Sequence, residues 1–484
     1  MPPTATNSSN AILAPTTASK QILPWLVGVA LFMESLDTTI LNTAVPAVAS
    51  ALHVGPLSMK AVLASYTLSL AIFIPISGWT ADRFGTRSVF SSAIALFTLG
   101  SCLCGMSSNI HLLVACRILQ GTGGAMMVPV GRLTLVRSFP KSELIRAMSF
   151  VSIPALIAPM LGPIAGGLIV AYLHWRFIFF LNVPIGLVGL LLVHLHLPDY
   201  QEENIHTLDF VGLILFGSGI ALLSYVLEIF GENTLSVREI VSLLAISVIL
   251  LAGYVIHGKE TAYPLLRLSL FKSRTFCVAV LGSFITRIGI GGVPFLLPLL
   301  YQIGLGYTPI QSGLLIMPQA LGALSVKAVM RPVLRMFGYR AVLIANTSII
   351  GILLAVFARI GKETPVALIL MLQFCYGWFT SLQYTCMNTL VYADTDEEEA
   401  SSAGSIASTM QQLSISFGVA LAGIMSALFL PNSAASISHQ VIRGIHDAFL
   451  TLAGLTVVSA LIFAGLRAGD GGDVSLQRPA HHGG

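Results

Sequence analysis

The chain has 484 residues, of which 55% are hydrophobic and only 10% are charged, and its mean hydropathy is +0.86. A water-soluble domain carries about 25% charged residues, so this composition excludes a single aqueous globule and indicates a polytopic helical membrane protein. The net charge of +4 comes from short, separate basic clusters, which argues against a nucleic-acid-binding surface.

The N-terminal segment and the cysteines give no sign of secretion or metal binding. Residues 1–21 are rich in Ser, Thr, Ala and Pro and lack the basic start and cleavage site of a signal peptide, so we expect a disordered cytoplasmic tail. The six cysteines lie in apolar segments and form no CxxC pair. This pattern favours buried, unpaired thiols over a zinc site or a disulfide framework.

Apolar runs of about 20 residues, separated by polar, Pro or Gly breaks, predict membrane-spanning helices. Fourteen such runs are present, at 22–46, 59–80, 88–108, 111–136, 144–172, 175–197, 208–230, 236–257, 275–303, 310–332, 340–360, 364–393, 402–430 and 443–467. The first six form a predicted N-terminal bundle (22–197) and the last six a C-terminal bundle (275–467). The middle pair lies in a linker (198–274), and residues 468–484 form a second cytoplasmic tail.

The distribution of Lys and Arg predicts the orientation. With the N-terminus inside, fifteen of the 25 basic residues fall on the cytoplasmic side and six outside. Since cytoplasmic loops carry the excess of positive charge, both termini are expected in the cytoplasm. The similar segments ADRFGTR (81–87) and LRMFGYR (334–340) each close the second helix of a six-helix set, which indicates two homologous halves. Transporters built this way bind substrate between the halves.

Two acids lie inside the first span, in MESLDTTILN (33–42). Glu34 and Asp37 are three residues apart, so we expect them on one helix face, looking into the same cavity and titrating as a coupled pair. Arg117 lies at about the depth of Asp37 in the fourth span. A carboxylate beside a guanidinium is stabilised as an anion and takes a proton when the pair separates, as an antiporter requires.

Three further segments carry patterned polar or small residues. GWTADRFGTR (78–87) is interpreted as a short loop, with an ordinary positively charged loop as the plainer alternative. RILQGTGGAMMVPVGR (117–132) contains Arg117 and Gln120 but follows no strand, which excludes a phosphate-binding loop in practice. APMLGPIAGGL (158–168) has a small-residue face, and plain helix packing explains it at least as well as any chemistry.

With LDTTILNTAVP (36–46), these motifs come in order on the expected spans, and nearly the whole chain resembles the major facilitator superfamily, specifically its fourteen-helix drug:proton antiporters. The resemblance implies a fold of two six-helix bundles plus two inserted helices. It also implies proton coupling at Asp37, to which we add Glu34 and Arg117 from their positions in the spans. It implies a conformational latch at Gly78, Asp82, Arg83, Gly85 and Arg87, and a hinge at Gly162, Pro163, Gly166 and Gly167.

Polar side chains within the spans are the candidates for a substrate cavity. They are Asn42, Gln120, Arg287, Gln383, Asn388, Gln411 and Gln412. We therefore predict a proton-coupled efflux transporter that exports small molecules, chiefly amphipathic drugs, by alternating access. Because Arg117 and Arg287 balance Glu34 and Asp37, an exporter of an organic anion such as citrate or a metal–citrate complex is the alternative.

Other classes of protein fit the sequence less well. An intramembrane enzyme needs a nucleophile–base pair or metal ligands at depth, and the chain contains no HExxH or GxSxG motif. A channel is disfavoured because no repeated filter-like loop occurs. We expect no catalytic residue, cofactor or metal. The expected partners are the substrate, protons and the lipid bilayer, with a monomer in the bacterial inner membrane.

Overall fold

Long apolar segments fold as helices in a bilayer because every backbone polar group must be satisfied within the segment. The computed structural model describes residues 17–202, 205–229, 236–396, 399–428, 437–467 and 469–471. Within these residues, thirteen helical segments are long and apolar enough to cross a membrane. The remaining expected span, the fifth, corresponds to α6, of which the shorter stretch Ile157–Tyr172 is apolar. The predicted all-helical membrane fold is confirmed.

The N-terminal helices are α1 (Thr17–Ala51), α2 (Lys60–Phe73), α3 (Ser77–Phe84), α4 (Thr86–Met106), α5 (Ile110–Ser138), α6 (Lys141–Tyr172), α7 (Phe177–Phe180) and α8 (Asn182–His196). The inserted pair is α9 (Phe210–Ile229) and α10 (Val237–Glu260). The C-terminal helices are α11 (Arg274–Gly291), α12 (Val293–Leu299), α13 (Pro309–Phe357), α14 (Val366–Leu390), α15 (Ala400–Leu428) and α16 (Ile437–Phe463). The predicted tails lie mostly outside the described residues, although α1 already begins at Thr17.

Two glycines mark equivalent turns in the two halves. Gly85, between α3 and α4, has a φ of 86°, and Gly338, inside α13, has a φ of 70°. A side chain strains the backbone at positive φ, so glycine suits both sites. The turn at Gly338 divides α13 into two membrane spans. The two FG-containing segments that suggested a duplication therefore form the same kind of turn.

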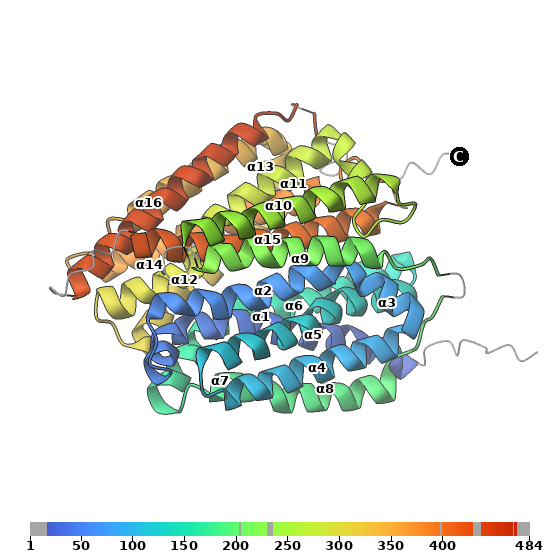
Figure 1. Cartoon of the computed structure of the whole chain (residues 1–484), viewed down its shortest axis with the longest axis horizontal. Helices are drawn as coiled ribbons and strands as arrows, with labels where there is room; N and C mark the ends of the chain where they lie inside the picture. The colour runs from blue at the N-terminus through green and yellow to red at the C-terminus, as the bar shows by residue number, and fades with distance from the viewer. Residues whose placement is uncertain are drawn as a thin grey trace, which may run out of the picture.

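The helices form two groups with the inserted pair beside them. In Figure 1 the blue-to-teal helices α1–α8 lie below, the yellow-to-red helices α11–α16 lie above, and the green helices α9 and α10 run along their junction. Helix α9 packs on α2 of the first group and on α15 of the second, whereas α10 packs mainly on α9. The inserted pair thus contacts both halves through a single helix.

The halves are joined near one end of the bundle. We call this end the far face, where α1 ends and α2 begins, and the other end, where α1 begins and α16 ends, the terminal face. Near the far face Gln302 Nε2 donates to the Thr43 carbonyl at 2.8 Å, and Ser416 Oγ donates to the Ala64 carbonyl at 3.3 Å. Helices α6 and α13 also meet there, where Gly167 packs on Pro309.

Candidate functional site

The centre of the N-terminal half contains a buried ion pair. Asp37 lies in the middle of α1, and Arg117 lies two turns into α5, whose first turn is capped by Asn109. Arg117 Nη1 is 2.5 Å from Asp37 Oδ2. Both residues are 1% exposed. The two charges expected at the same depth therefore meet directly.

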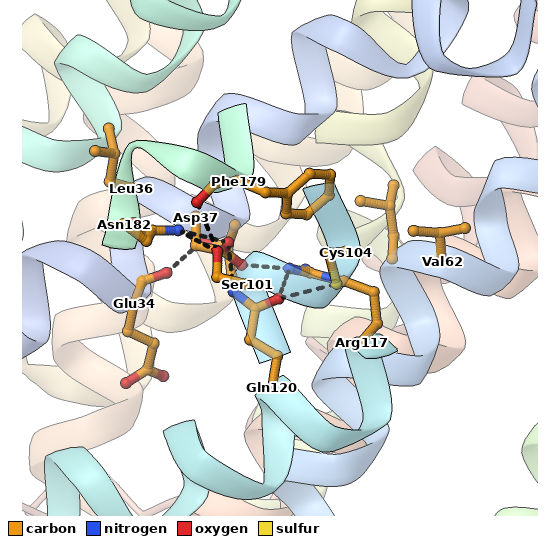
Figure 2. A network of polar contacts seen from close by, with 12 residues as sticks. Glu34, Leu36, Asp37, Val62, Ser101, Cys104, Arg117, Gln120, Phe179 and Asn182 are labelled. Carbon is orange, nitrogen blue, oxygen red and sulfur yellow. Dashed lines mark hydrogen bonds and ion pairs between the residues drawn. The ribbon is translucent and has the colours of Figure 1, made fainter. Parts of the chain in front are cut away.

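An amide completes a triangle around this pair. Gln120, one turn after Arg117, accepts from Arg117 Nη1 at 2.8 Å through Oε1 and donates to Asp37 Oδ1 at 2.8 Å through Nε2. The spacing of three residues on α5 places both side chains on one helix face. Gln120 was expected in a substrate cavity, but it is fully buried and belongs to the ion-pair network shown in Figure 2.

Two further residues, which we did not predict from the sequence, extend the network: Asn182 of α8 binds the carboxylate, and Ser101 of α4 binds Asn182. Asn182 Nδ2 donates to Asp37 Oδ1 at 3.1 Å and to Ser101 Oγ at 3.1 Å. Ser101 Oγ in turn donates to the Phe179 carbonyl at 2.9 Å. Asn182 is the one polar residue in the run FIFFLNVPIGL (177–187), which is the signal that could have revealed it.

The environment of Arg117 is aromatic on one side. Its guanidinium carbon lies 4.2 Å from the centre of the Tyr66 ring, a cation–π distance. Arg117 Nε and the Tyr66 hydroxyl are buried without a hydrogen-bond partner. An ion pair removed from water depends on its mutual attraction and its hydrogen bonds, so a change at either charge is expensive. The site therefore holds the carboxylate and the guanidinium together away from water.

Glu34 does not join this network. Figure 2 shows its carboxylate turned away from the cluster around Asp37, and its Oε2 atom is buried without a hydrogen-bond partner. Within the described residues, no Lys, Arg or His nitrogen lies within 4.0 Å of a Glu34 carboxylate oxygen. The two acids on one predicted face thus lie in different surroundings.

The C-terminal half buries its own arginine without an acid. Arg287 in α11 is 3% exposed and donates to Ser283 Oγ at 2.9 Å and to Asn388 Oδ1 at 2.8 Å. Its guanidinium carbon lies 4.2 Å from the centre of the Tyr384 ring. These partners are neutral, and among the described residues no carboxylate forms an ion pair with it. Two of the predicted cavity residues, Arg287 and Asn388, are therefore in contact.

The other predicted cavity residues are scattered. Gln383 is fully buried within its own half, where it donates to Thr347 Oγ1 at 2.7 Å and accepts from Asn346 Nδ2 at 2.9 Å. Asn42, Gln411 and Gln412 are half-buried, and their own side chains form no hydrogen bond with another described residue, although Ser414 Oγ donates to the backbone carbonyl of Gln411 at 2.7 Å. The structure does not bring these residues together with the ion pair.

The residues of the predicted latch lie together around the turn at Gly85, but most of them are helical, whereas we expected a loop. Helix α3 continues to Phe84, so only Gly85 interrupts the helical backbone. Asp82 Oδ1 accepts from Arg137 Nη2 at 2.8 Å, and Arg137 also donates to Glu202 at 2.9 Å. Ala81, within the motif, is fully buried, so this part of the motif packs as a helix against the bundle.

Residues 198–202 and 205–206, which lie between α8 and α9, contact this turn and α3. We call them the strap. Arg87 N donates to Asp199 Oδ1 at 3.0 Å, and the Arg87 side chain donates to the His194 carbonyl. Gln201 Nε2 donates to the Arg83 carbonyl at 2.7 Å. Gly78 lies exposed one turn earlier, and next to it Trp79 Nε1 donates to the His206 carbonyl of the strap at 2.8 Å.

The predicted hinge glycines lie at tight helix crossings. A methyl group on Gly162 would come within 2.7 Å of Thr39 Cβ on α1, and one on Gly166 would meet the Ile40 carbonyl. A methyl group on Gly167 would lie 2.6 Å from the Pro309 carbonyl oxygen of the other half. The carbonyl of Pro163 faces Gly313 of α13 in the same way. These residues permit α6 to touch both α1 and α13.

Comparison with known proteins agrees with this architecture. The sequence profile described as "Major Facilitator Superfamily" matches residues 27–419 and 279–482. The chain is 40% identical over 443 residues to the "Putative multidrug resistance protein MdtD" of Shigella sonnei strain Ss046, covering 91% of this chain and 93% of that protein. It is also 40% identical over 455 residues to the protein of the same name from Serratia proteamaculans strain 568, covering 93% and 94%.

Solved structures show the same fold at low sequence identity. The D-xylose–proton symporter superposes with a TM-score of 0.65 at 15% identity, covering 93% of this chain and 98% of that one. The POT family transporter PepTSo superposes with a TM-score of 0.69 at 13% identity, covering 92% and 97%. The chain belongs to the Major Facilitator Superfamily.

Proposed function

We propose that the protein is a proton-coupled exporter of amphipathic small molecules that works by alternating access. The observation that carries the proposal is the sealed ion pair between Asp37 and Arg117 inside the N-terminal half. A buried carboxylate keeps its charge while its guanidinium partner is in place and takes up a proton when the pair separates. Proton uptake at Asp37 and a change of structure are therefore the same event.

A continuous series of contacts leads from this pair to the other half. Thr39 and Ile40 follow Asp37 on α1 and pack against the glycines of α6. Gly167, which follows Gly166 of that contact on α6, packs against Pro309 of α13 in the second half. A shift of α1 on protonation of Asp37 would therefore move α6 against α13. This is the kind of packed, discrete linkage through which two sites become coupled.

Proteoliposomes with an imposed pH gradient test the proposal. The wild-type protein should drive an amphipathic dye against its concentration gradient and move protons in the opposite direction. Asp37→Asn keeps the shape but cannot exchange a proton, so it should still bind the dye and lose gradient-driven transport. Transport by Asp37→Asn with an unchanged pH profile would show that the proton is carried elsewhere.

The drug-like substrate is supported by the name of the relatives, which describes multidrug resistance. An organic anion such as citrate or a metal–citrate complex is a second candidate, and one observation favours it. Arg287 is buried among neutral partners, which leaves its positive charge available to an anionic ligand. A carboxylate that inhibits dye export competitively in the same proteoliposomes would support this second function.

We also propose that the protein acts as a monomer in the bacterial inner membrane with both termini in the cytoplasm. The excess of Lys and Arg on the terminal face supports this orientation. In that orientation the halves meet near the periplasmic side, and the ion pair lies between the two membrane surfaces.

A further inference from the structure

The two halves of the chain keep a constant register. Gly85 and Gly338, the two glycines with positive φ at the FG turns, are 253 positions apart. The same separation relates Gln120 of α5 to Gln373 of α14, and Gly124 to Gly377 in the same helices. It also relates Glu34 of α1 to Arg287 of α11. An acidic and a basic residue therefore occupy equivalent positions in the first helix of each half.

Neither of these two charges has an ion-pair partner among the residues that the structure describes. Arg287 uses its nitrogens on Ser283 and Asn388, which are neutral. Glu34 has a buried oxygen without any hydrogen-bond partner. Arg132 is in electrostatic range of Glu34 but forms no ion pair with it within 4.0 Å. In contrast, Asp37 and Arg117 saturate one another, so they are not free to bind a ligand.

Exposed polar residues lie next to both charges near one end of the bundle. Asn388, which holds Arg287, is exposed near the C-terminal end of α14, and Arg132 is exposed near the C-terminal end of α5. Polar side chains exposed inside a membrane protein point toward an aqueous interior, because contact with lipid is costly. Arg132 of the first half is also in electrostatic range of Tyr392 of the second half, which lies in the turn after α14, four residues beyond Asn388. These residues therefore approach each other across the junction.

We propose that Glu34 and Arg287 are the two charged ends of one binding site for a zwitterion, a small molecule that carries both an ammonium and a carboxylate. The ammonium would bind Glu34 in the N-terminal half, and the carboxylate would bind Arg287 in the C-terminal half beside Asn388. The inference rests on the proposed export function and names its substrate class. A ligand with one charge leaves the other group desolvated and unpaired when the halves close, and this lowers its affinity.

A matched series of three ligands tests the site on the purified, full-length protein. The first is a zwitterionic fluoroquinolone with a piperazinyl ammonium and a carboxylate. The second is its methyl ester, which keeps only the cation, and the third is its N-acetyl derivative, which keeps only the anion. We expect the zwitterion to bind at least about tenfold more tightly than either derivative in titration calorimetry.

Two isosteric variants assign the ends of the site. Arg287→Gln should remove the preference for the zwitterion over the ester, and Glu34→Gln should remove the preference for the zwitterion over the N-acetyl derivative. The ratio of two affinities within one variant is the readout, so a general loss of folded protein does not imitate the result. Arg238→Gln, which removes an exposed charge in the first turn of α10, should keep both ratios.

The outcomes separate the inference from the proposed function. An ester that binds and is exported as well as the zwitterion overturns the two-ended site and leaves proton-coupled drug export standing. An N-acetyl derivative that binds as well as the zwitterion assigns the ligand to Arg287 alone and also overturns the site. Failure of all three compounds to bind, or to be exported by proteoliposomes, overturns both proposals.

Discussion

Asp37 of α1 and Arg117 of α5 form an ion pair at 2.5 Å in a part of the bundle where each residue is only 1% exposed. The pair joins two helices that are distant in the sequence. Gln120 and Asn182 both donate to Asp37 Oδ1, and Arg117 donates to Oδ2, so both oxygens of the carboxylate accept hydrogen bonds. The same few hydrogen bonds therefore join α1, α5 and α8 around this carboxylate.

Removing one charge of this pair should destabilise the protein more than removing both. Arg117→Ala leaves a buried carboxylate without its cation, which costs about 3–5 kcal/mol in comparable sites. The double variant Asp37→Asn, Arg117→Gln leaves no buried charge and should recover part of that loss. Thermal unfolding of the three proteins in detergent measures the effect. A double variant less stable than Arg117→Ala would contradict this view of the pair.

Gly167→Ala should weaken the contact between the halves at the far face. The added methyl group would lie 2.6 Å from the Pro309 carbonyl and 3.0 Å from Cα of Ile310, and backbone atoms cannot yield as a flexible side chain does. Overpacking of this kind costs about 1–3 kcal/mol, so the closed far face should lose about tenfold or more in population. Accessibility of a cysteine introduced at Thr43 to a membrane-impermeant thiol reagent reports the change.

The matched control is Gly454→Ala in α16, because a methyl group there has no other atom within 4 Å. This variant should keep the labelling rate of the wild-type protein. Equal labelling of Gly167→Ala and Gly454→Ala would show that the α6–α13 contact does not hold the far face closed.

Asp82→Asn should impair transport and leave ligand binding nearly unchanged. Asp82 accepts from Arg137 at the end of α5, and it is far along the chain from the ion pair. Its loss should free Arg137 and loosen the turn at Gly85, which alters the balance between conformations without touching a ligand. Initial rates of dye export and calorimetric affinities, taken from one preparation, separate the two effects.

Glu202→Gln is the control for this charge, since Glu202 binds the same arginine from an exposed position. Exposed ion pairs contribute about 0–1 kcal/mol, so its effect on export should be small. A loss of affinity in Asp82→Asn equal to its loss of transport would show that the latch was misassigned.

Asp209 should make stability dependent on pH in the acid range. Burial acts to raise the pKa of this carboxyl, but hydrogen bonds from His257 and from the backbone N–H groups of Gly212 and Leu265 outweigh it, and the pKa is lowered from its ordinary value of 3.8. Because the pKa of Asp209 is lower in the folded than in the unfolded protein, its ionised form stabilises the fold at any pH above the unfolded-state pKa. This contribution is lost as the pH falls through the folded-state pKa.

Melting temperatures of wild-type and Asp209→Asn proteins between about pH 3 and pH 7 test this linkage. The difference should be constant at neutral pH and shrink once the pH falls below about 4. Asp470→Asn, at another acid paired with a basic side chain on the surface, serves as the control. A difference between wild-type and Asp209→Asn that persists unchanged to pH 3 would exclude the charge of Asp209 as its cause.

Reporter fusions test the orientation. A reporter after Gly484 should report the cytoplasm, and one inserted near Asn432 should report the periplasm; both positions lie outside the described residues. An insertion at Lys362, in the described loop between α13 and α14, should agree with the second reporter. The opposite location at any of these sites would break the fourteen-span topology.

The sequence predicted those features that depend on helical geometry alone. The depth of Asp37 and Arg117 could be counted along two straight spans, and their contact follows from that depth. The turn at Gly85 was placed correctly, although its flanks are helical where a loop was expected. The length of each apolar run and the helical repeat carry this information, because a segment that crosses the membrane here must be a helix.

The rest of the site depends on packing between helices, which no local pattern encodes. Glu34 shares a broad face with Asp37, but the cluster occupies a narrower sector of that face and leaves Glu34 outside. Asn182 reaches Asp37 only because α7 and α8 meet at Leu181 in a turn. The strap has no periodicity, so its contacts with Arg83 and Arg87 could not be foreseen.

Helix α9 makes the two sides of the molecule unlike one another. It covers the seam between α2 and α15, whereas the equivalent seam between α6 and α13 has no such helix in the described part of the chain. A lipophilic molecule dissolved in the bilayer would then have one lateral entrance to the space between the halves instead of two. By covering one of two equivalent seams, the inserted pair would restrict lateral entry from the bilayer to the other seam.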